Sequence, residues 1–300
     1  MRMRSRIIRL TSATALATLV GFTSSWAASA APSSEISYWA LNETTIGTPA
    51  RDSIGTNIGE AFGSPQPTPS TDVPFTENGN TGSMLFDGQN YIKVNNTLSA
   101  DFSICAWIKT QSTGGSNHWE NAPIVMAEQG GFAYDYGFGV NSEGKLSFGN
   151  GGNITESAQA DQTIAGNKLV NDNTWHHVCV SRNNSNGEIA LYVDGALDAT
   201  GVTGLGLINS NSEAWIGHGQ DGNAPFVGLI DEVRFYSSVL TLAEIQEIFA
   251  PAPPVEEATN EPEEELVLAD TGFTTENLLL MGIMFLFAGS MILILKRVRN

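Results

Sequence analysis

Short runs in which apolar and polar residues alternate, each bounded by Gly, Asn, Asp or Ser, fill the chain from Ile36 to Phe249. A period of two predicts β-strands with one buried face. No helical periodicity interrupts these runs, which argues against an alternating α/β fold and favours an antiparallel sandwich. The runs that show the pattern best are Phe102–Lys109, Ile124–Ala127, Tyr136–Val140, Lys145–Phe148, Trp175–Ser181, Glu188–Val193, Ala214–Ile216 and Phe226–Tyr236.

Two dipeptides predict hairpin turns between neighbouring runs. Asn186-Gly187 separates Trp175–Ser181 from Glu188–Val193, and Glu143-Gly144 separates Tyr136–Val140 from Lys145–Phe148. Asn-Gly favours the primed two-residue turn, whose twist matches that of the flanking strands. We therefore expect tight hairpins at both places.

One short helix is predicted after the last strand. Thr241 followed three residues later by Glu244 fits a capping box, in which each side chain bonds the backbone N–H of the other. Leu242, Ile245, Ile248 and Phe249 then share one face, and Pro251 stops the helix. This helix should close the folded domain, which we place at residues 31–250.

Residues 1–30 have the pattern of an export signal. An Arg-rich start precedes a short apolar stretch from Leu10 to Phe22, and Ala28-Ser29-Ala30 offers the small residues that a signal peptidase needs. The stretch is too short and too rich in Thr and Ser for a spanning helix, which needs about 20 apolar residues. The chain should then be exported and begin at Ala31. A helical anchor that is never cleaved is the alternative.

The C-terminal part predicts a membrane anchor. Residues 251–267 are rich in Pro and Glu and cannot bury enough surface to fold, so they should form an extended acidic stalk. Residues 276–295 should form an apolar transmembrane helix, and the basic tail 296–300 should stay in the cytoplasm with the domain outside. A buried core helix is the alternative, although such a helix would normally carry a polar face.

The chain is strongly acidic, with 14 Lys and Arg against 32 Asp and Glu and a net charge of −18. Half of the basic residues lie in the two ends, so the exported part is still more acidic for its length. An acidic surface repels phosphate backbones, and we expect no nucleic acid partner. Two cysteines, Cys105 and Cys179, could form one bridge outside the cell or remain two buried thiols.

Several stretches, in order, resemble the laminin-G-like, pentraxin-related proteins of the concanavalin A-like superfamily. The resemblance covers nearly all of residues 35–250 and implies an all-β fold of two stacked antiparallel sheets, a jellyroll sandwich. It also implies that Cys105 and Cys179 pair. The stretches are Tyr38 to Glu43, Asp52 to Asn57, Phe102 to Trp107, Trp175 to Val180, Leu191 to Gly195 and Gly228 to Tyr236.

A second resemblance concerns the anchor. A five-residue segment upstream of the apolar span is similar to a sortase sorting signal, with Ala269 at the position where that signal usually has Pro; its residues are Leu268, Ala269, Asp270, Thr271 and Gly272. The resemblance implies a sortase that cuts after Thr271 and joins the chain to cell-wall peptide. Otherwise the chain remains a single-pass membrane protein at the cell surface.

Asp231 is the polar residue that the strand pattern singles out. Val227, Leu229, Val233 and Phe235 share its parity in Phe226–Tyr236, so its carboxylate should face an apolar layer. A buried carboxylate needs a cation or several donors. Since hard oxygen ligands suit Ca²⁺, Asp231 could bind a structural calcium ion with Asp52 and Asn57. A carboxylate capped by backbone N–H groups is the alternative.

Two Gly-rich loops offer a binding surface. They carry Trp119, Asp135 and Tyr136, and exposed aromatic rings beside polar groups suit sugar rings. In the alternative, Tyr136 and Phe138 are core residues and Trp119 is a half-buried loop residue.

The resemblance and these loops together imply a non-enzymatic module for adhesion, whose partner is a glycan or a surface protein. Asp231 and Glu232 are consecutive and so face opposite ways, which does not suit the carboxylate pair of a glycan hydrolase. The adjacent His176 and His177 cannot chelate one ion for the same reason. A structural envelope spacer without a soluble ligand, and a glycan-active enzyme on the same fold, remain the alternatives.

Overall fold

The computed structural model describes residues 32–74, 79–128, 130, 134–151, 161–220 and 225–249. The predicted export signal, stalk, sorting motif, apolar span and basic tail all lie outside these residues. Within them, no helix combines the length and apolar character that crossing a bilayer requires.

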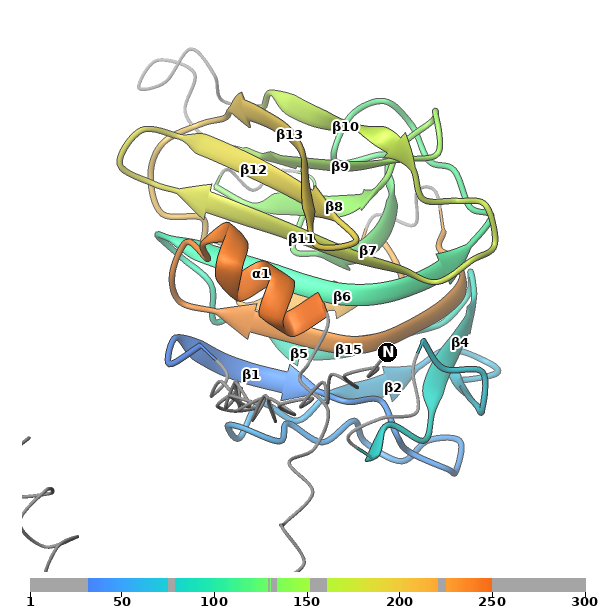
Figure 1. The fold of residues 1–300 in the computed structure, drawn as a ribbon. Helices are drawn as coiled ribbons and strands as arrows, with labels where there is room; N and C mark the ends of the chain where they lie inside the picture. The colour runs from blue at the N-terminus through green and yellow to red at the C-terminus, as the bar shows by residue number, and fades with distance from the viewer. Residues whose placement is uncertain are drawn as a thin grey trace, which may run out of the picture. The chain divides into compact units, whose positions relative to one another are not determined.

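Two antiparallel sheets form the domain (Figure 1). The first sheet has the order β13-β12-β11-β6-β15-β4-β3, with β1 also paired to β15, and the second has the order β10-β9-β8-β7-β14-β5-β2. The first contains β1 (Glu35–Trp39), β3 (Thr68–Ser70), β4 (Ser83–Asp87), β6 (Phe102–Thr110), β11 (His176–Asn183), β12 (Glu188–Val193), β13 (Ala196–Val202) and β15 (Val227–Tyr236). The second contains β2 (Glu60–Phe62), β5 (Tyr91–Asn95), β7 (Ala122–Met126), β8 (Tyr136–Val140), β9 (Lys145–Asn150), β10 (Thr163–Leu169) and β14 (Glu213–Ile216).

The hydrophobic core lies between the two sheets and follows the alternation in the sequence. Ile104, Ala106 and Ile108 of β6 belong to it, as do Phe138 of β8 and Phe148 of β9, and all five are fully buried. Burying each large apolar side chain stabilises the fold by about 1.5–3 kcal/mol. The predicted two-sheet sandwich is therefore confirmed.

The predicted helix is present as α1 (Leu242–Phe249) and covers the outer face of the first sheet (Figure 1). Its capping box is formed: the Thr241 backbone N–H donates to Glu244 Oε2 at 2.7 Å, and the Glu244 N–H donates to Thr241 Oγ1 at 3.3 Å. Ile245 of the helix is fully buried in a second apolar cluster with Tyr236 and Leu240. The sheet thus has apolar residues on both faces where α1 lies on it.

The hairpin between β11 and β12 is longer than its Asn-Gly dipeptide predicts. Asn183 pairs with Glu188, which leaves a four-residue connection, and only Gly187 in it has a positive φ, of 74°. The Gly187 N–H donates to the Asn183 carbonyl at 2.8 Å. A primed two-residue turn needs positive φ at both central residues, so that prediction was wrong. At the β8–β9 turn, likewise, Gly144 has positive φ and Glu143 does not.

Candidate functional site

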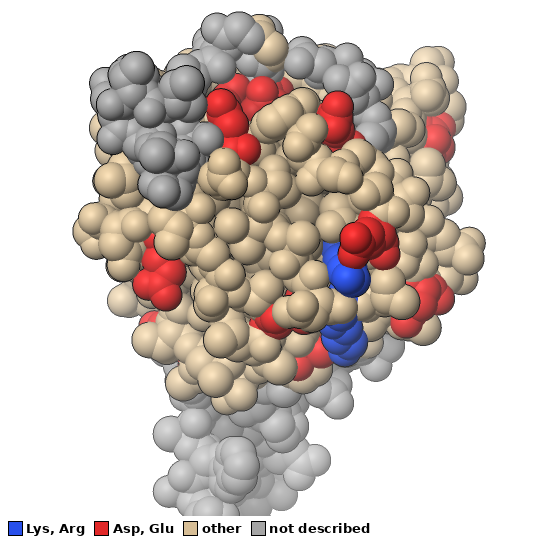
Figure 2. All heavy atoms as spheres, turned by 90° about the horizontal axis from the view of Figure 1, so that it is seen from above, with Lys and Arg blue, Asp and Glu red and all other residues tan. Residues whose placement is uncertain are grey.

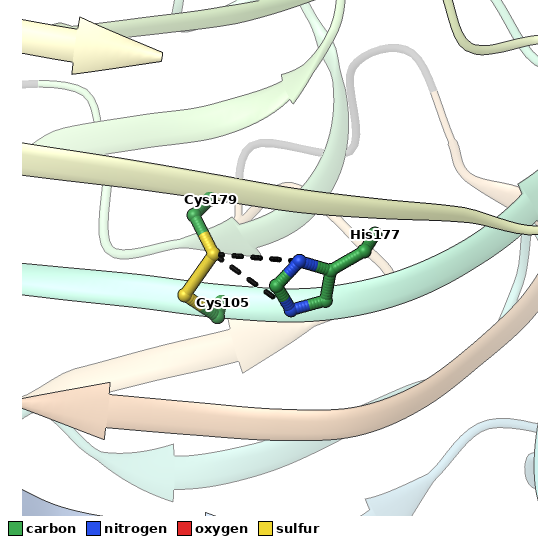
Figure 3. A group of neighbouring side chains, drawn as sticks. All are labelled: Cys105, His177 and Cys179. Atoms are coloured by element: carbon green, nitrogen blue, oxygen red, sulfur yellow. Dashed lines mark hydrogen bonds between the residues drawn. A yellow bond between two sulfur atoms is a disulfide. The ribbon is translucent and has the colours of Figure 1, made fainter. Parts of the chain in front are cut away.

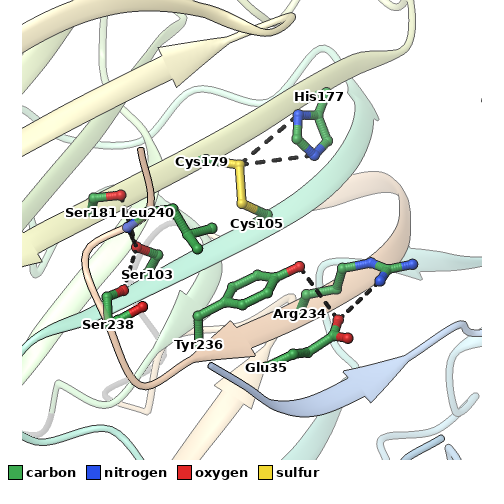
Figure 4. The surroundings of a disulfide bond; sticks show 10 residues. All are labelled: Glu35, Ser103, Cys105, His177, Cys179, Ser181, Arg234, Tyr236, Ser238 and Leu240. Carbon is green, nitrogen blue, oxygen red and sulfur yellow. Dashed lines mark hydrogen bonds and ion pairs between the residues drawn. A yellow bond between two sulfur atoms is a disulfide. The ribbon is translucent and has the colours of Figure 1, made fainter. Parts of the chain in front are cut away.

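The two cysteines form a disulfide between adjacent strands, as predicted. Cys105 in β6 and Cys179 in β11 are direct register partners with Cα atoms 4.2 Å apart, and their sulfurs are bonded. Both are fully buried beneath α1, beside Tyr236 and Leu240 (Figure 4). The bridge is therefore part of the second apolar cluster and has no contact with solvent.

His177 lies against this disulfide (Figure 3), with its two ring nitrogens 3.9 Å and 3.8 Å from Cys179 Sγ. Its ring also packs near Trp107 and Phe249. Burial, helped by the positive charge of Arg234, lowers the pKa of His177 to about 3. A neutral imidazole beside two sulfurs already bonded to each other does not form a metal site.

Asp52 is held by the loop that contains it. Its Oδ1 accepts the backbone N–H groups of Tyr38, Ile54 and Gly55 at 2.9–3.1 Å, and its Oδ2 accepts that of Asn57 at 3.1 Å. Burial acts to raise its pKa, but these four donors outweigh burial and hold the pKa below its usual range. The negative charge of Asp52 is thus already balanced by N–H dipoles.

Asn57 is also committed to the protein. Its Oδ1 accepts the Asn95 N–H at 2.9 Å and its Nδ2 donates to the Asn95 carbonyl at 2.9 Å. The Asn57 side-chain amide therefore pairs with Asn95, the last residue of β5, as the backbone of a neighbouring strand would. Among the described residues, neither Asn57 nor Asp52 bonds Asp231, so no hydrogen bond links the three predicted calcium ligands.

Asp231 is fully buried, as predicted, but a β-bulge in β15 means that it does not share a face with the residues expected from strand parity. The register of β15 against β6 shifts between Asp231 and Arg234, and Glu232 has a φ of 53°. Ile230 and Val233 both belong to the core between the sheets, so the parity that links Asp231 to Val233 is broken at the bulge. The register instead places Asp231 opposite Trp107. The predicted alignment of Asp231 with Val233 and Phe235 was wrong, because it assumed an unbroken strand.

The partners of Asp231 are an amide and a backbone group. Asn80 Nδ2 donates to Oδ2 at 2.9 Å, and the Glu232 N–H donates to Oδ1 at 2.9 Å. Asn80 Oδ1 is buried and accepts no hydrogen bond. Burial raises the pKa of Asp231 to about 8; the Asn80 bond opposes this shift, and the charge of Glu232 adds to it. Asn80 Oδ1 is thus a buried acceptor without a donor, next to a buried carboxylate with two neutral donors.

Trp119 belongs to a loop that packs on the outer side of β8 and β9. A side chain at Gly137 would collide with the His118 carbonyl, and one at Gly149 with the His118 ring. The two glycines therefore let the loop lie directly on the sheet. Trp119 meets the His118 ring edge to face, with centroids 4.8 Å apart, and keeps part of its surface exposed.

His118 fixes this loop from beneath. It is fully buried; its N–H donates to Thr163 Oγ1 at 2.9 Å and its Nδ1 lies 3.2 Å from the same oxygen. Its Nε2 lies 3.5 Å from Glu128 Oε2 without a hydrogen bond. Burial lowers the pKa of His118 to about 4, although the charges of Asp135 and Asp161 act in the other direction. The ring is therefore neutral at physiological pH.

The other two predicted ligand-binding residues are buried. Tyr136 has no exposed surface, and its ring packs between Phe102 and Phe148, with its hydroxyl donating to Asn96 Oδ1 at 3.3 Å. Asp135 is 1% exposed. Tyr136 occupies an inward position of β8, so the prediction that it faces a ligand was wrong. Of the three predicted residues, Trp119 alone offers its side chain to solvent.

A cleft at one end of the sandwich was not predicted. It has a volume of about 470 Å³ and lies where β6 begins, β11 turns into β12, and β15 ends. We call it the end cleft; its polar lining comes from Thr97, Ser99, Asp101, Asn184, Ser185 and Ser237. These residues stand in three separate turns, and none belongs to a recognisable motif, so the sequence carried no signal for the cleft.

Comparisons with known proteins agree with the observed fold. The family model described as the concanavalin A-like lectin/glucanases superfamily, of the laminin-G type, matches residues 86–246. The adhesion G-protein coupled receptor V1 of Danio rerio is 29% identical over 161 residues, which are 50% of this chain. The chain spans only 2% of the length of that receptor.

Solved structures share the architecture at low sequence identity. Domain 4 of the extracellular GH43 arabinanase AbnA from Geobacillus stearothermophilus superposes with a TM-score of 0.53 at 16% identity, over 72% of this chain and 98% of that one. A botulinum neurotoxin type C structure gives 0.50 at 16% identity, over 72% of this chain and 50% of that one. At such identities the likeness shows the fold alone. With the family match over more than half of its length, the chain belongs to the laminin-G type of the concanavalin A-like lectin/glucanases superfamily.

Proposed function

We propose that this chain is a non-enzymatic binding module of the cell surface and that its ligand is a carbohydrate. The observation that carries the proposal is Trp119, a partly exposed indole on a loop that buried His118 locks onto the glycines of β8 and β9. An aromatic ring on a rigid support can stack on the C–H face of a sugar with little loss of entropy on binding.

The relatives support carbohydrate as the ligand class. The arabinanase domain was solved in complex with arabinotriose, and cell entry of the neurotoxin depends on two ganglioside molecules. The curated relative is an adhesion receptor. These are properties of those proteins, and the fold alone hosts many functions, so they guide the choice of probe and no more.

The described carboxylates support binding without catalysis. Glycan hydrolysis needs two carboxyl groups across a cleft, about 5 Å apart in retaining enzymes and somewhat farther in inverting ones. Glu232 instead accepts the Tyr38 hydroxyl at 2.7 Å and pairs with Arg234 at 2.8 Å. Of two clefts lined by described residues, the end cleft contains one carboxylate, Asp101, and the other, beside Lys109, contains none.

The test is a glycan array probed with the purified full chain. We expect binding to a subset of glycans, and Trp119→Ala should reduce it at least tenfold because the stacking surface is lost. Trp175→Ala is the matched control, since Trp175 is also a half-buried surface tryptophan, tied to Asp72 through its indole N–H. An array without bound glycans, or equal losses for both variants, would contradict the proposal.

We also propose a structural calcium ion at Asp231 and Asn80. Asp52 and Asn57, the other predicted ligands, have their side-chain oxygens occupied by backbone N–H groups. Asn80 Oδ1 is buried without a partner and its amide bonds the fully buried carboxylate of Asp231, and amide and carboxylate oxygens are the ligands that a hard cation prefers. Bound Ca²⁺ would supply the positive charge that a buried carboxylate otherwise lacks.

Display at the surface is the last part of the proposal. The export signal, the LADTG motif with sortase as its processing partner, and the membrane span remain as the sequence predicts them. Mass spectrometry of the chain from its native cells tests all three: we expect it to begin at Ala31, and sorting predicts a C-terminus at Thr271 linked to cell-wall peptide. A chain that keeps Met1 and Asn300 would contradict both export processing and sorting.

A further inference from the structure

The end cleft has walls that are fixed from inside the protein. Arg182 is fully buried below it. Its Nη1 donates to the Ala100 carbonyl at 2.8 Å, and its Nη2 donates to Asn184 Oδ1 at 3.3 Å. Both acceptors belong to residues that line the cleft. One buried guanidinium thus holds together two chain segments that are more than eighty residues apart in sequence.

Burying the charge of Arg182 to join these segments lowers the stability of the fold. Its remaining acceptors are the carbonyls of Gly204 and Gly206, at 2.9 and 2.8 Å, and its Nε is buried without a partner. No carboxylate forms an ion pair with it among the described residues. Burial accordingly lowers the pKa of Arg182 to about 10, and the charge of Asp101 partly opposes the shift. A buried charge with only neutral acceptors reduces stability. Proteins retain such a group where it holds a binding site in one geometry.

The polar groups that remain free in the cleft are complementary to hydroxyls. Asp101 Oδ1 accepts the Asn184 N–H at 2.7 Å, whereas its Oδ2 has no partner within the described structure. Asn184 Oδ1 accepts Arg182 and the Gly206 N–H, which leaves its Nδ2 hydrogens to donate. The hydroxyls of Thr97 and Ser99 bond no other described side chain or backbone group. The cleft thus offers a fixed carboxylate acceptor beside a fixed amide donor.

Such a pair matches a sugar ring better than other ligands. Each sugar hydroxyl both donates and accepts, so two neighbouring hydroxyls can donate to Asp101 and accept from Asn184. The lining carries no Lys or Arg and one negative charge, which disfavours phosphate, sulfate and carboxylate groups. Acidic side chains are also spread over the face seen in Figure 2, whereas basic ones are confined to one part of it. A volume of about 470 Å³ is within the range of small-ligand sites.

We infer that the end cleft is a binding site for a neutral sugar residue of a glycan, with Asp101 as acceptor, Asn184 as donor and Arg182 as the residue that positions them. The inference rests on the proposed carbohydrate-binding function. It adds a site separate from the Trp119 loop and names the chemical class of ligand that fits it.

The experiment uses the isotope-labelled full chain and methyl glycosides of glucose, galactose, mannose and arabinose, with glucuronic acid as the anionic comparison. Amide chemical-shift mapping on the unmodified chain should show the largest changes at Ser99, Asp101 and Asn184 for at least one neutral glycoside, and smaller ones for glucuronic acid. Asn184→Asp should weaken binding at least tenfold, because it removes the Nδ2 donor yet keeps the oxygen that Arg182 needs. Asp101→Asn should weaken it similarly.

Asp87→Asn is the matched control, since Asp87 is an exposed carboxylate that also accepts one backbone N–H, from Gln89. It should bind as the unmodified chain does. Glycoside binding with shifts confined to the Trp119 loop, and unchanged affinity in Asp101→Asn and Asn184→Asp, would overturn the inference and leave the proposed function standing. Absence of binding to any glycan, on the array and in solution, would overturn both.

Discussion

The imidazole of His177 lies against the sulfur of Cys179, with both ring nitrogens within 3.9 Å of it, inside a cluster sealed by α1. A histidine in this position cannot carry a charge without breaking apolar contacts. The relationship makes His177 one of the residues on which the acid stability of the domain depends.

We expect the domain to lose stability as the pH falls below about 6.5, the ordinary pKa of His. The pKa of His177 is about 3 when folded, so between these values the unfolded chain binds the extra proton and unfolding is favoured. The free energy of unfolding should fall by at most about 1.4 kcal/mol per pH unit from this residue. His177→Phe should remove that part of the slope in urea titrations at pH 4–7.

His118 also has a lowered pKa, about 4, and remains in both proteins. The difference between variant and unmodified chain therefore reports His177 alone. Identical pH slopes would show that His177 does not titrate as its burial requires.

Removing the disulfide should destabilise the domain without changing its sheet order. Cys105 and Cys179 close a loop with a sequence separation of 74, and such a cross-link restricts the unfolded chain by about 4 kcal/mol. The double variant Cys105→Ala, Cys179→Ala should have a free energy of unfolding lower by about this amount, measured by urea denaturation. Far-ultraviolet circular dichroism should remain that of the unmodified chain, because the ladder between β6 and β11 does not depend on the sulfurs. A loss below 1 kcal/mol would contradict the prediction.

Calcium should raise the melting temperature of the full chain after chelation by about 3 °C at tenfold excess over its dissociation constant. Asp231→Asn should abolish this rise. Asp52→Asn should lower the melting temperature in both conditions, because a carboxylate with four N–H partners is lost, but it should keep the rise. If the rise disappears in Asp52→Asn and persists in Asp231→Asn, Asp52 and not Asp231 is the calcium ligand. If the unmodified chain shows no rise, the proposed calcium site is wrong.

Arg182→Lys should cost about 2–3 kcal/mol of stability, because one ammonium cannot reach the four acceptors that the guanidinium connects. Arg51→Lys is the control, since Arg51 is exposed and should change stability by less than about 0.5 kcal/mol. Equal melting temperatures for the two variants would show that Arg182 does not organise the loops.

Much of the fold could be predicted because it depends on residues that are close together in the sequence. The capping box at Thr241 and Glu244 formed as expected, and Glu188–Val193 and Tyr136–Val140 have the predicted bounds. The strands that the pattern missed, such as β2 and β3, have three residues each and show no alternation of their own. Their place depends on pairing with β5 and β4.

The site was harder to predict because it depends on contacts distant in sequence. One bulge at Glu232 broke the parity argument for Asp231, and no local residue signalled it. The Asn186-Gly187 turn opened into a longer loop in which Asn184 is bonded to Arg182. Tyr136 and Trp119 looked alike as loop aromatics, and only the position of the sheet decides that one is core and the other is at the surface.

The pairing of β15 has a mechanical consequence. This strand lies beside β6 along one edge, and beside β4 and then β1 along the other, so the first and last strands of the domain are neighbours. Force applied to the C-terminal end of the domain would first detach α1 from the sheet. It would then pull β15 along its own axis, so that its hydrogen-bond ladders are loaded in shear. Its ladders to β6, β4 and β1 must then rupture together, which gives the domain a high resistance to force applied along β15.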